Sequence, residues 1–181
     1  MSDRELIREI QRGKKEYLND IAEKYYDDIY RFCCYQVGNC QDAGDLAQET
    51  FLHFIRSVEQ FHCRNLKGYL LTIARNVCMD YFRGCKRRQE HEEQFWQGEL
   101  GAGQEAFSQQ AGSWQEEFLV TVRQLAEELP QMQREAVVLY YGYGFKYREI
   151  AKMTGAGIAT VKSRVRQGTE KLKKSLAGEG L

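Results

Sequence analysis

Hydrophobic residues recur every three or four positions along the first half of the chain, and this spacing predicts amphipathic helices. One such helix lies within residues 44–61, and its apolar face consists of Leu46, Phe51, Phe54 and Ile55. Another lies within residues 66–88, and its apolar stripe consists of Leu70, Ile73, Ala74, Val77 and Tyr81. Because both patterns have the period of a helix rather than a strand, we predict a helical first half.

The same period returns after residue 113. A helix ending near residue 129 places Phe118, Val122, Leu125 and Leu129 on one face. Pro130 then begins a new helix, where the missing N–H of proline does no harm. This next helix directs Met132, Ala136, Leu139 and Tyr140 inward, and Gly142 and Gly144 end it.

The segment from Phe145 to Leu172 predicts two helices joined by a sharp turn. The first, at residues 147–153, turns Ile150 and Ala151 inward, and the small alanine lets another helix cross closely. Gly155 permits the turn. The second helix begins near Ile158, and its inward residues are Ile158, Val161, Val165 and Leu172. This order is typical of a helix-turn-helix, which binds duplex DNA.

Between the two helical halves lies a stretch rich in Gln, Glu, Gly and Ser, with no lasting apolar period. We predict that residues 89–113 form a flexible acidic linker. The expected fold is all-α, with two small helical domains at residues 1–88 and 114–181. The C-terminal domain is the helix-turn-helix.

The charged residues are not spread evenly along the chain but are grouped in basic and acidic blocks. The 181 residues hold 26 Lys and Arg against 26 Asp and Glu, so the net charge is zero. Residues 61–88 nevertheless carry +6, residues 89–117 carry −7 with no Lys or Arg, and residues 146–174 carry +7. Because a partner senses the local field, the two basic blocks favour nucleic acid.

Helical geometry then divides the second basic block into two kinds of DNA contact. The face opposite Val161 and Val165 predicts base contacts by Thr160, Ser163, Arg166 and Gln167. The flanking positions predict phosphate contacts by Arg148, Lys162 and Arg164.

The first basic block interleaves cations with aromatic residues such as Tyr69 and Phe82. Such a mixture suits unpaired single-stranded bases, because aromatic rings stack on bases and cations hold the backbone. The preceding loop, residues 62–65, is a candidate receiver for a flipped base. The helix within 44–61 instead has an acidic, polar face made by Asp45, Gln48 and Glu49. This face favours a protein partner over DNA.

Three motifs in one order carry a resemblance to a known family. DLAQETF, GYLLTIARNVCMDYFR and LPQMQREAVVLYYGYGFKYREIAKMTGAGIATVKSRVRQGTEKL resemble a bacterial RNA polymerase sigma factor of the sigma-70 family, extracytoplasmic-function (ECF) group. The resemblance covers roughly residues 20–177. It implies a protein that binds core RNA polymerase, directs it to promoters and helps open the −10 region.

The resemblance also implies roles for particular residues. Asp45, Gln48 and Glu49 would dock on the clamp helices of the polymerase β′ subunit. The residues expected to recognise and melt the −10 element are Asn65, Tyr69, Arg75, Asn76 and Arg83. The helix-turn-helix would read the −35 element as duplex and touch the β flap, the acidic linker would thread the polymerase cleft, and an anti-sigma factor is an expected partner.

Two departures from the family pattern bear on these roles. Tyr69 stands where the family often has Trp, which leaves less surface for stacking. Gln167, Gly168 and Thr169 replace a usual Arg-Ala-Arg run, and Gly168 is expected to loosen the helix by about 1 kcal/mol relative to Ala. Gln167 has the geometry to favour adenine.

Other features of the sequence limit the alternatives. We find no nucleophile–base pair, phosphate loop or metal motif, so we expect binding without catalysis, cofactor or small-molecule substrate. The six cysteines form no CxxC pair and are expected to be buried or surface thiols, with a redox or metal role as the alternative. The start lacks a signal peptide pattern, which predicts a cytoplasmic protein. A stand-alone helix-turn-helix regulator, or an interaction protein whose linker mimics nucleic acid, remains the competing hypothesis.

Overall fold

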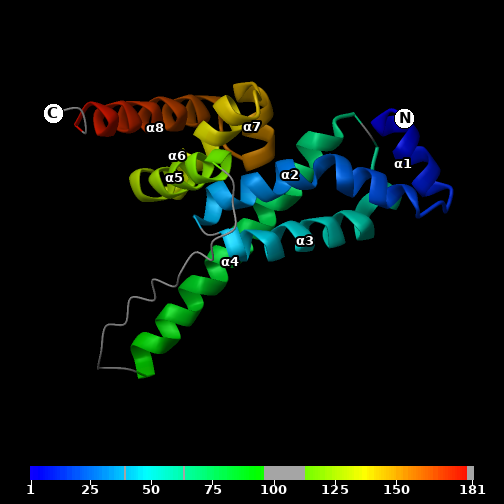
Figure 1. Cartoon of the computed structure of the whole chain (residues 1–181), viewed down its shortest axis with the longest axis horizontal. Helices are drawn as coiled ribbons and strands as arrows, with labels where there is room; N and C mark the ends of the chain where they lie inside the picture. Colours follow the sequence, from blue (N-terminus) through cyan, green and yellow to red (C-terminus); the bar gives the residue numbers. More distant parts are fainter. Residues whose placement is uncertain (39, 63, 96–112, 179–181) are drawn as a thin grey trace.

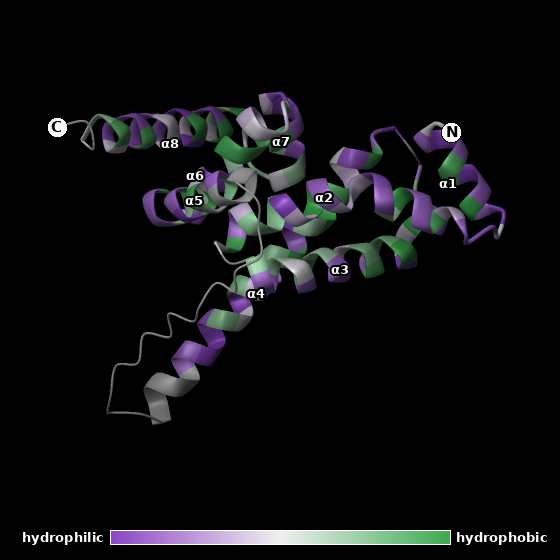
Figure 2. Cartoon of the chain, in the orientation of Figure 1, coloured by the Kyte–Doolittle hydropathy of each residue, from purple (hydrophilic) through white to green (hydrophobic). Residues whose placement is uncertain are grey.

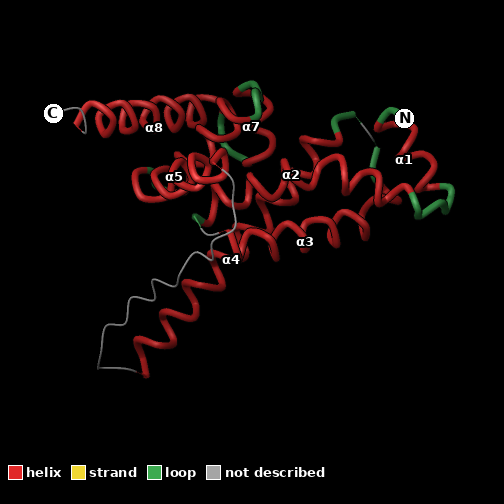
Figure 3. The backbone as a smooth tube through the Cα atoms, in the orientation of Figure 1, coloured by secondary structure: helices red, strands yellow, loops and turns green. Residues whose placement is uncertain are grey.

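The chain is described by a computed structural model for residues 1–38, 40–62, 64–95 and 113–178. The helices are α1 (Asp3–Gln11), α2 (Tyr17–Val37), α3 (Cys40–Ser57), α4 (Leu66–Phe95), α5 (Ser113–Glu128), α6 (Gln131–Val137), α7 (Tyr147–Thr154) and α8 (Ile158–Gly178). A 3-10 turn, η1 (Val58–Gln60), follows α3, and a π-helical turn, η2 (Val138–Gly142), follows α6. Helices and loops, with no strand, make up these described ranges, which confirms the all-α prediction (Figure 3).

The N-terminal half is a bundle in which α2 and α3 lie side by side and α4 crosses them (Figure 1). Its centre is apolar, and the fully buried side chains there include Ile21, Ile29, Phe32, Phe54 and Leu70. Each comes from the apolar stripe of its helix. Burial of such a side chain stabilises a fold by about 1.5–3 kcal/mol, so the amphipathic pattern positions these helices.

Local signals set the helix ends of this bundle. Ser2 and Glu5 cap the start of α1 with reciprocal hydrogen bonds. Gly38 adopts a left-handed conformation, φ 70°, and ends α2. Oδ1 of Asn65 accepts a hydrogen bond from the Gly68 N–H at 2.9 Å, which caps the start of α4.

The C-terminal half packs α8 across α6, with α5 below and α7 at one end (Figure 1). Figure 2 shows that polar and apolar residues alternate along α8. Val161 and Val165 are buried, as the apolar period predicts, whereas Ile158 is 42% exposed. Ile158 opens α8 right after the turn, so it lies beyond the helices that cover the following turns.

The second half of α4 extends the fold beyond the expected boundary. Helix α4 continues to Phe95, seven residues past residue 88, and its far end projects from the body of the molecule (Figure 1). Gln and Glu favour helix, and Lys86 and Glu90 form an ion pair one turn apart, with N and O 3.9 Å from each other. The expected flexible stretch falls largely on residues 96–112, outside the described residues, and its flexibility stays a prediction.

The two halves are in contact through polar and aromatic pairs. Nη2 of Arg134 donates to the Gln36 carbonyl at 2.6 Å, and the Tyr143 hydroxyl donates to the Asp28 carbonyl at 2.6 Å. The ring of Tyr35 meets that of Phe118 edge-on at 5.2 Å. The C-terminal half therefore packs against the second half of α2, from Asp28 to Gln36.

Candidate nucleic-acid interface

The recognition surface is the solvent side of α8 together with the start of α7. Its exposed side chains are Arg148, Thr160, Lys162, Arg166 and Gln167, and its half-buried ones are Ser163 and Arg164. All seven belong to the candidate duplex-DNA residues, and the helix brings them together on one side. The positive charge thus lies opposite the buried valines, on the side of α8 that is open to solvent.

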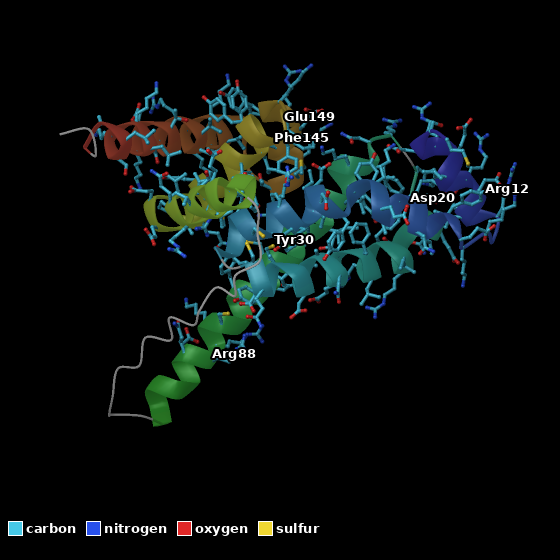
Figure 4. The ribbon with its side chains drawn as sticks, viewed as in Figure 1. Arg12, Asp20, Tyr30, Arg88, Phe145 and Glu149 are labelled. Carbon is cyan, nitrogen blue, oxygen red and sulfur yellow. The ribbon has the colours of Figure 1, made fainter. Side chains whose placement is uncertain are left out.

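The turn before α8 fixes how this surface is presented. Gly155 ends α7 with φ 68°, a left-handed backbone conformation that residues other than glycine rarely adopt. Phe145, just before α7, and Ile150, within α7, are buried. Glu149 points outward and accepts a hydrogen bond from the Lys146 N–H at 2.7 Å (Figure 4). The predicted helix-turn-helix geometry is confirmed.

Gln167 and Gly168 have structural roles that the sequence did not reveal. The Gln167 amide accepts a hydrogen bond from Gln133 at 3.0 Å and donates one to Ser163 at 3.1 Å. A Cβ at Gly168 would lie 2.7 Å from Cγ2 of Val137. Gly168 thus allows α6 and α8 to approach closely, and this packing role comes in addition to the expected cost in helix propensity, which stays a prediction.

The basic part of α4 contains an ion pair with the other half of the molecule. Nε of Arg75 lies 2.5 Å from Oε1 of Glu135, and the two side chains are 14% and 4% exposed. Burial raises the pKa of the Glu135 carboxyl, while the charge of Arg75 and its hydrogen bond lower it. Arg75, a candidate for −10 contacts, is therefore occupied by a carboxylate in this arrangement.

Two other −10 candidates also have partners within the chain. Asn65 is exposed and caps α4. The ring of Tyr69 stacks on Phe61, with centroids 4.2 Å apart, and its hydroxyl donates to Ser57 at 2.9 Å. One face of Tyr69 is thus covered, which limits the stacking surface that it offers to a base.

Asn76 and Arg83 are exposed on α4. Asn76 accepts a hydrogen bond from Arg75 at 3.3 Å, and Arg83 pairs with Asp80 at 2.8 Å, where both partners are largely exposed. Arg88 lies further along, on the projecting part of α4 (Figure 4). Asn76 and Arg83, about two helical turns apart, therefore form an accessible ridge on one side of α4. In the loop before it, His62, Arg64 and Asn65 are exposed, and Cys63 lies outside the described residues.

The docking surface is the outer side of α3. Asp45, Gln48 and Glu49 are all exposed, as the acidic pattern predicts, and Oε1 of Glu49 lies 3.6 Å from Nε2 of His53. Sequence reasoning missed Leu52, which is 54% exposed, and placed Ile55 in the core, although it is 44% exposed. Leu52 lies four residues after Gln48 and three after Glu49, and Ile55 lies three residues after Leu52, so helical spacing was the available signal. The surface therefore combines an acidic patch with an apolar one.

Two further kinds of site were sought among the described residues, a metal centre and a membrane span. No group of three or more His, Cys, Asp or Glu side chains in them is arranged to hold a metal ion. None of the described helices is long and apolar enough to cross a membrane.

Comparison with known proteins agrees with this arrangement. Residues 21–88 match the family profile of sigma-70 region 2, and residues 119–172 match that of sigma-70 region 4. The chain is 29% identical over 182 residues to the ECF RNA polymerase sigma factor SigW of Bacillus subtilis, covering 94% of each chain. It is 34% identical over 144 residues to the sigma factor EcfG of Rhodopseudomonas palustris, covering 79% of this chain and 76% of the relative.

Solved structures show the same fold. The sigma factor RpoE, in complex with the anti-sigma factor NepR from Bartonella quintana, is 27% identical with a TM-score of 0.69, over 90% of this chain and 98% of that one. CnrH, in complex with the cytosolic domain of CnrY, has a TM-score of 0.71 at 18% identity, over 98% of this chain and 99% of that one.

A helix-turn-helix that follows a helical bundle matching sigma-70 region 2 is the arrangement of a promoter-directing factor of transcription. With both conserved regions matched in order, the chain belongs to the sigma-70 family, in its ECF group. Proteins of this family direct RNA polymerase to promoters and initiate transcription. The match to region 2 gives the first half a role that a stand-alone helix-turn-helix regulator would not require.

Proposed function

We propose that the recognition surface, the basic part of α4 and the docking surface act together in one initiation complex. The docking surface binds the clamp helices of the polymerase β′ subunit. The recognition surface reads the −35 element, and the C-terminal half touches the β flap. The observation that carries this proposal is the exposure of all three surfaces on the described helices.

The exposed ridge of α4 is the part proposed to recognise and hold the melted −10 strand. Asn76 and Arg83 are accessible there, while Asn65 lies at the helix start and Tyr69 has one face stacked on Phe61. Unstacking a base costs a few kcal/mol, and stacking on an aromatic ring returns about 1–3 kcal/mol per base. Capture of the unpaired strand therefore offsets much of the melting energy.

Arg75 joins this ridge only when its carboxylate partner leaves. Glu135 belongs to the C-terminal half, so separation of the two halves on polymerase would free Arg75 for a phosphate or a base. A DNA phosphate would then replace the Glu135 carboxylate, so that the Arg75 guanidinium has an anionic partner in both states. We propose that Arg75 contacts the −10 region in the separated state only.

The protein acts by binding rather than by catalysis, in the cytoplasm, where the polymerase is. An anti-sigma factor is a further proposed partner, supported by the complex of RpoE with NepR. The acidic segment within 89–113 is proposed to thread the polymerase cleft, although residues 96–112 lie outside the described part.

Permanganate probing of unpaired thymines tests the proposal. Holoenzyme made with the Asn76→Ala/Arg83→Ala variant should show several-fold lower thymine reactivity in the −10 region, with unchanged binding of core polymerase. The matched control is Asp80→Asn, which alters the exposed partner of Arg83 on the same helix. Full reactivity in the double variant would remove the −10 role from this ridge.

A further inference from the structure

A cluster of two thiols and one phenol lies where α2 ends and α3 begins. Gly38, in a left-handed conformation, ends α2, and Cys40 is the first residue of α3. The thiols of Cys34 and Cys40 are hydrogen-bonded to each other, and the hydroxyl of Tyr30 is hydrogen-bonded to both. Tyr30, labelled in Figure 4, lies one helical turn before Cys34 on α2.

The two thiols differ in solvent exposure and in pKa, as expected of an attacking and a resolving cysteine. Cys34 is fully buried, whereas Cys40 is partly exposed and is the first residue of α3. A helix N-terminus favours a thiolate. The hydrogen bonds from Cys34 and Tyr30 lower the pKa of the Cys40 thiol to about 7, against the opposing effect of burial. The hydrogen bond with Cys40 and burial raise the pKa of Cys34, against the opposing effect of Tyr30.

We propose that Cys40 and Cys34 form a peroxide-responsive site, in which Cys40 is the attacking thiolate and Cys34 is the resolving thiol. Accessible thiolates beside a second cysteine are the usual targets of such oxidation. The inference rests on the thiol pair alone and is independent of the promoter and polymerase contacts proposed above.

The chemistry needs only a hydroperoxide as oxidant. The Cys40 sulfur attacks one peroxide oxygen, the O–O bond breaks, and hydroxide leaves and takes up a proton to become water. Cys40 is then a sulfenic acid. The Cys34 sulfur attacks the Cys40 sulfur, the S–S bond forms, and the sulfenic oxygen leaves as a second water with the proton that Cys34 gives up.

The position of the bond links two surfaces of the molecule. The last turn of α2 also carries Tyr35, which contacts Phe118, and the Gln36 carbonyl, which accepts from Arg134. Helix α3 presents the docking surface from Asp45 onward. A Cys34–Cys40 disulfide would link the last turns of α2, which contact the C-terminal half, to the first residue of α3, the helix that carries the docking surface.

Other thiols of the chain provide internal controls. Cys33 and Cys78 are also hydrogen-bonded to each other, but both are buried, and this contact and burial raise the pKa of Cys33. Cys85 is partly exposed like Cys40, but its recorded partners are Arg88 and Tyr81 instead of another thiol. We expect both sets to stay reduced while Cys40 reacts.

Peptide mapping of the full chain tests the site directly. The reduced protein is treated with about one equivalent of hydrogen peroxide, quenched with N-ethylmaleimide and digested with trypsin. Residues 32–56 form one tryptic peptide that holds Cys33, Cys34 and Cys40. With a Cys34–Cys40 disulfide, this peptide should be two hydrogens lighter than the reduced peptide and should carry one N-ethylmaleimide group. Fragmentation should place that group on Cys33.

Variants separate the two steps. Cys34→Ala should leave a sulfenic acid at Cys40 that a 1,3-diketone traps, and Cys40→Ser should abolish the reaction. Cys85→Ser should behave like wild type. The rate in wild type should rise with pH and level off above about 7, because the thiolate of Cys40 is the nucleophile.

Three results would overturn the proposal. The wild-type peptide could carry three maleimides after oxidation, the bond could join Cys33 with Cys78, or Cys85 could react as fast as Cys40. Because the wild-type map needs no variant, a folding defect in Cys34→Ala would not obscure the answer.

Discussion

Gly168 sets the distance between α6 and α8. Its α-carbon is buried against Val137 and Gln133, and a methyl group there would collide with Val137. Gly84, on α4, has nothing within 4 Å of the corresponding position. The two glycines lie in helices, but only one of them is required by packing.

We expect Gly168→Ala to lower the free energy of unfolding by about 1–3 kcal/mol, because the overpacked methyl group outweighs the better helix propensity of Ala. Gly84→Ala is the matched control and should raise it by about 0.5–1 kcal/mol. Urea unfolding followed by circular dichroism measures both. Equal stabilisation by the two substitutions would show that α6 and α8 do not approach closely.

The Arg75–Glu135 ion pair makes a second prediction at this scale. Arg75→Ala leaves a buried carboxylate without its cation, which should weaken the packing of the two halves by about 3 kcal/mol at neutral pH. The exposed Arg83, paired with Asp80, is the control, and Arg83→Ala should cost less than about 0.5 kcal/mol. Small-angle scattering should detect an expanded Arg75→Ala protein.

The pH dependence of this effect has a definite sign. Burial raises the pKa of Glu135 above its usual 4.5, so the folded state gains stability as the carboxyl takes up a proton, and this gain is lost as the pH rises through the folded pKa. Removal of Arg75 raises that pKa further. The defect should therefore shrink as the pH falls from neutral toward the usual carboxyl value of 4.5, and a defect that grows on acidification would contradict the assignment.

At the scale of the element, α3 presents both charge and apolar area to its partner. Glu49→Lys should weaken binding of core polymerase at least about tenfold, because it places a cation in an acidic contact. Glu127→Lys, on exposed α5, makes the same charge change elsewhere and should leave binding unchanged. Competition with a reference sigma factor for core polymerase gives the affinities.

Helix α8 is expected to read sequence with some residues and to hold phosphates with others. Gln167→Ala should relax a preference for adenine at one position of the −35 element. Lys162→Ala, at a predicted phosphate contact, should weaken binding evenly across sequences and reduce the salt slope by about 0.9. Footprinting of holoenzyme on promoter variants at several salt concentrations distinguishes the two. An unchanged base preference in Gln167→Ala would leave that residue with only its bonds to Gln133 and Ser163.

The helices could be predicted from sequence because periodicity and caps are local. Residues within four positions of one another were enough to predict the apolar stripes and the exposed acidic face of α3. The turn at Gly155 is likewise a local signal. Ile55 and Ile158 were misplaced because each lies at the edge of a stripe, where a neighbouring helix decides burial. The partners of Arg75, Gly168 and Cys34 come from other elements, and no spacing along one helix reveals them.

At the scale of the whole molecule, the two halves form one apolar cluster in the described structure. The contacts between them occupy Arg75 and the end of α2. Under the proposal that Arg75 contacts the −10 region, the promoter contacts would belong to two states, with Arg75 available only in the separated one. Recognition of two promoter elements by one chain would then depend on polymerase to hold the halves apart.

The central claim is that this chain gives core polymerase a promoter specificity of its own. Run-off transcription on fragmented genomic DNA of the source organism, with bacterial core polymerase in the presence and absence of the protein, tests it most directly. We predict new transcript starts that share upstream −35 and −10 sequences. The absence of new starts, together with tight binding of the free protein to duplex DNA, would contradict the claim and favour a stand-alone regulator.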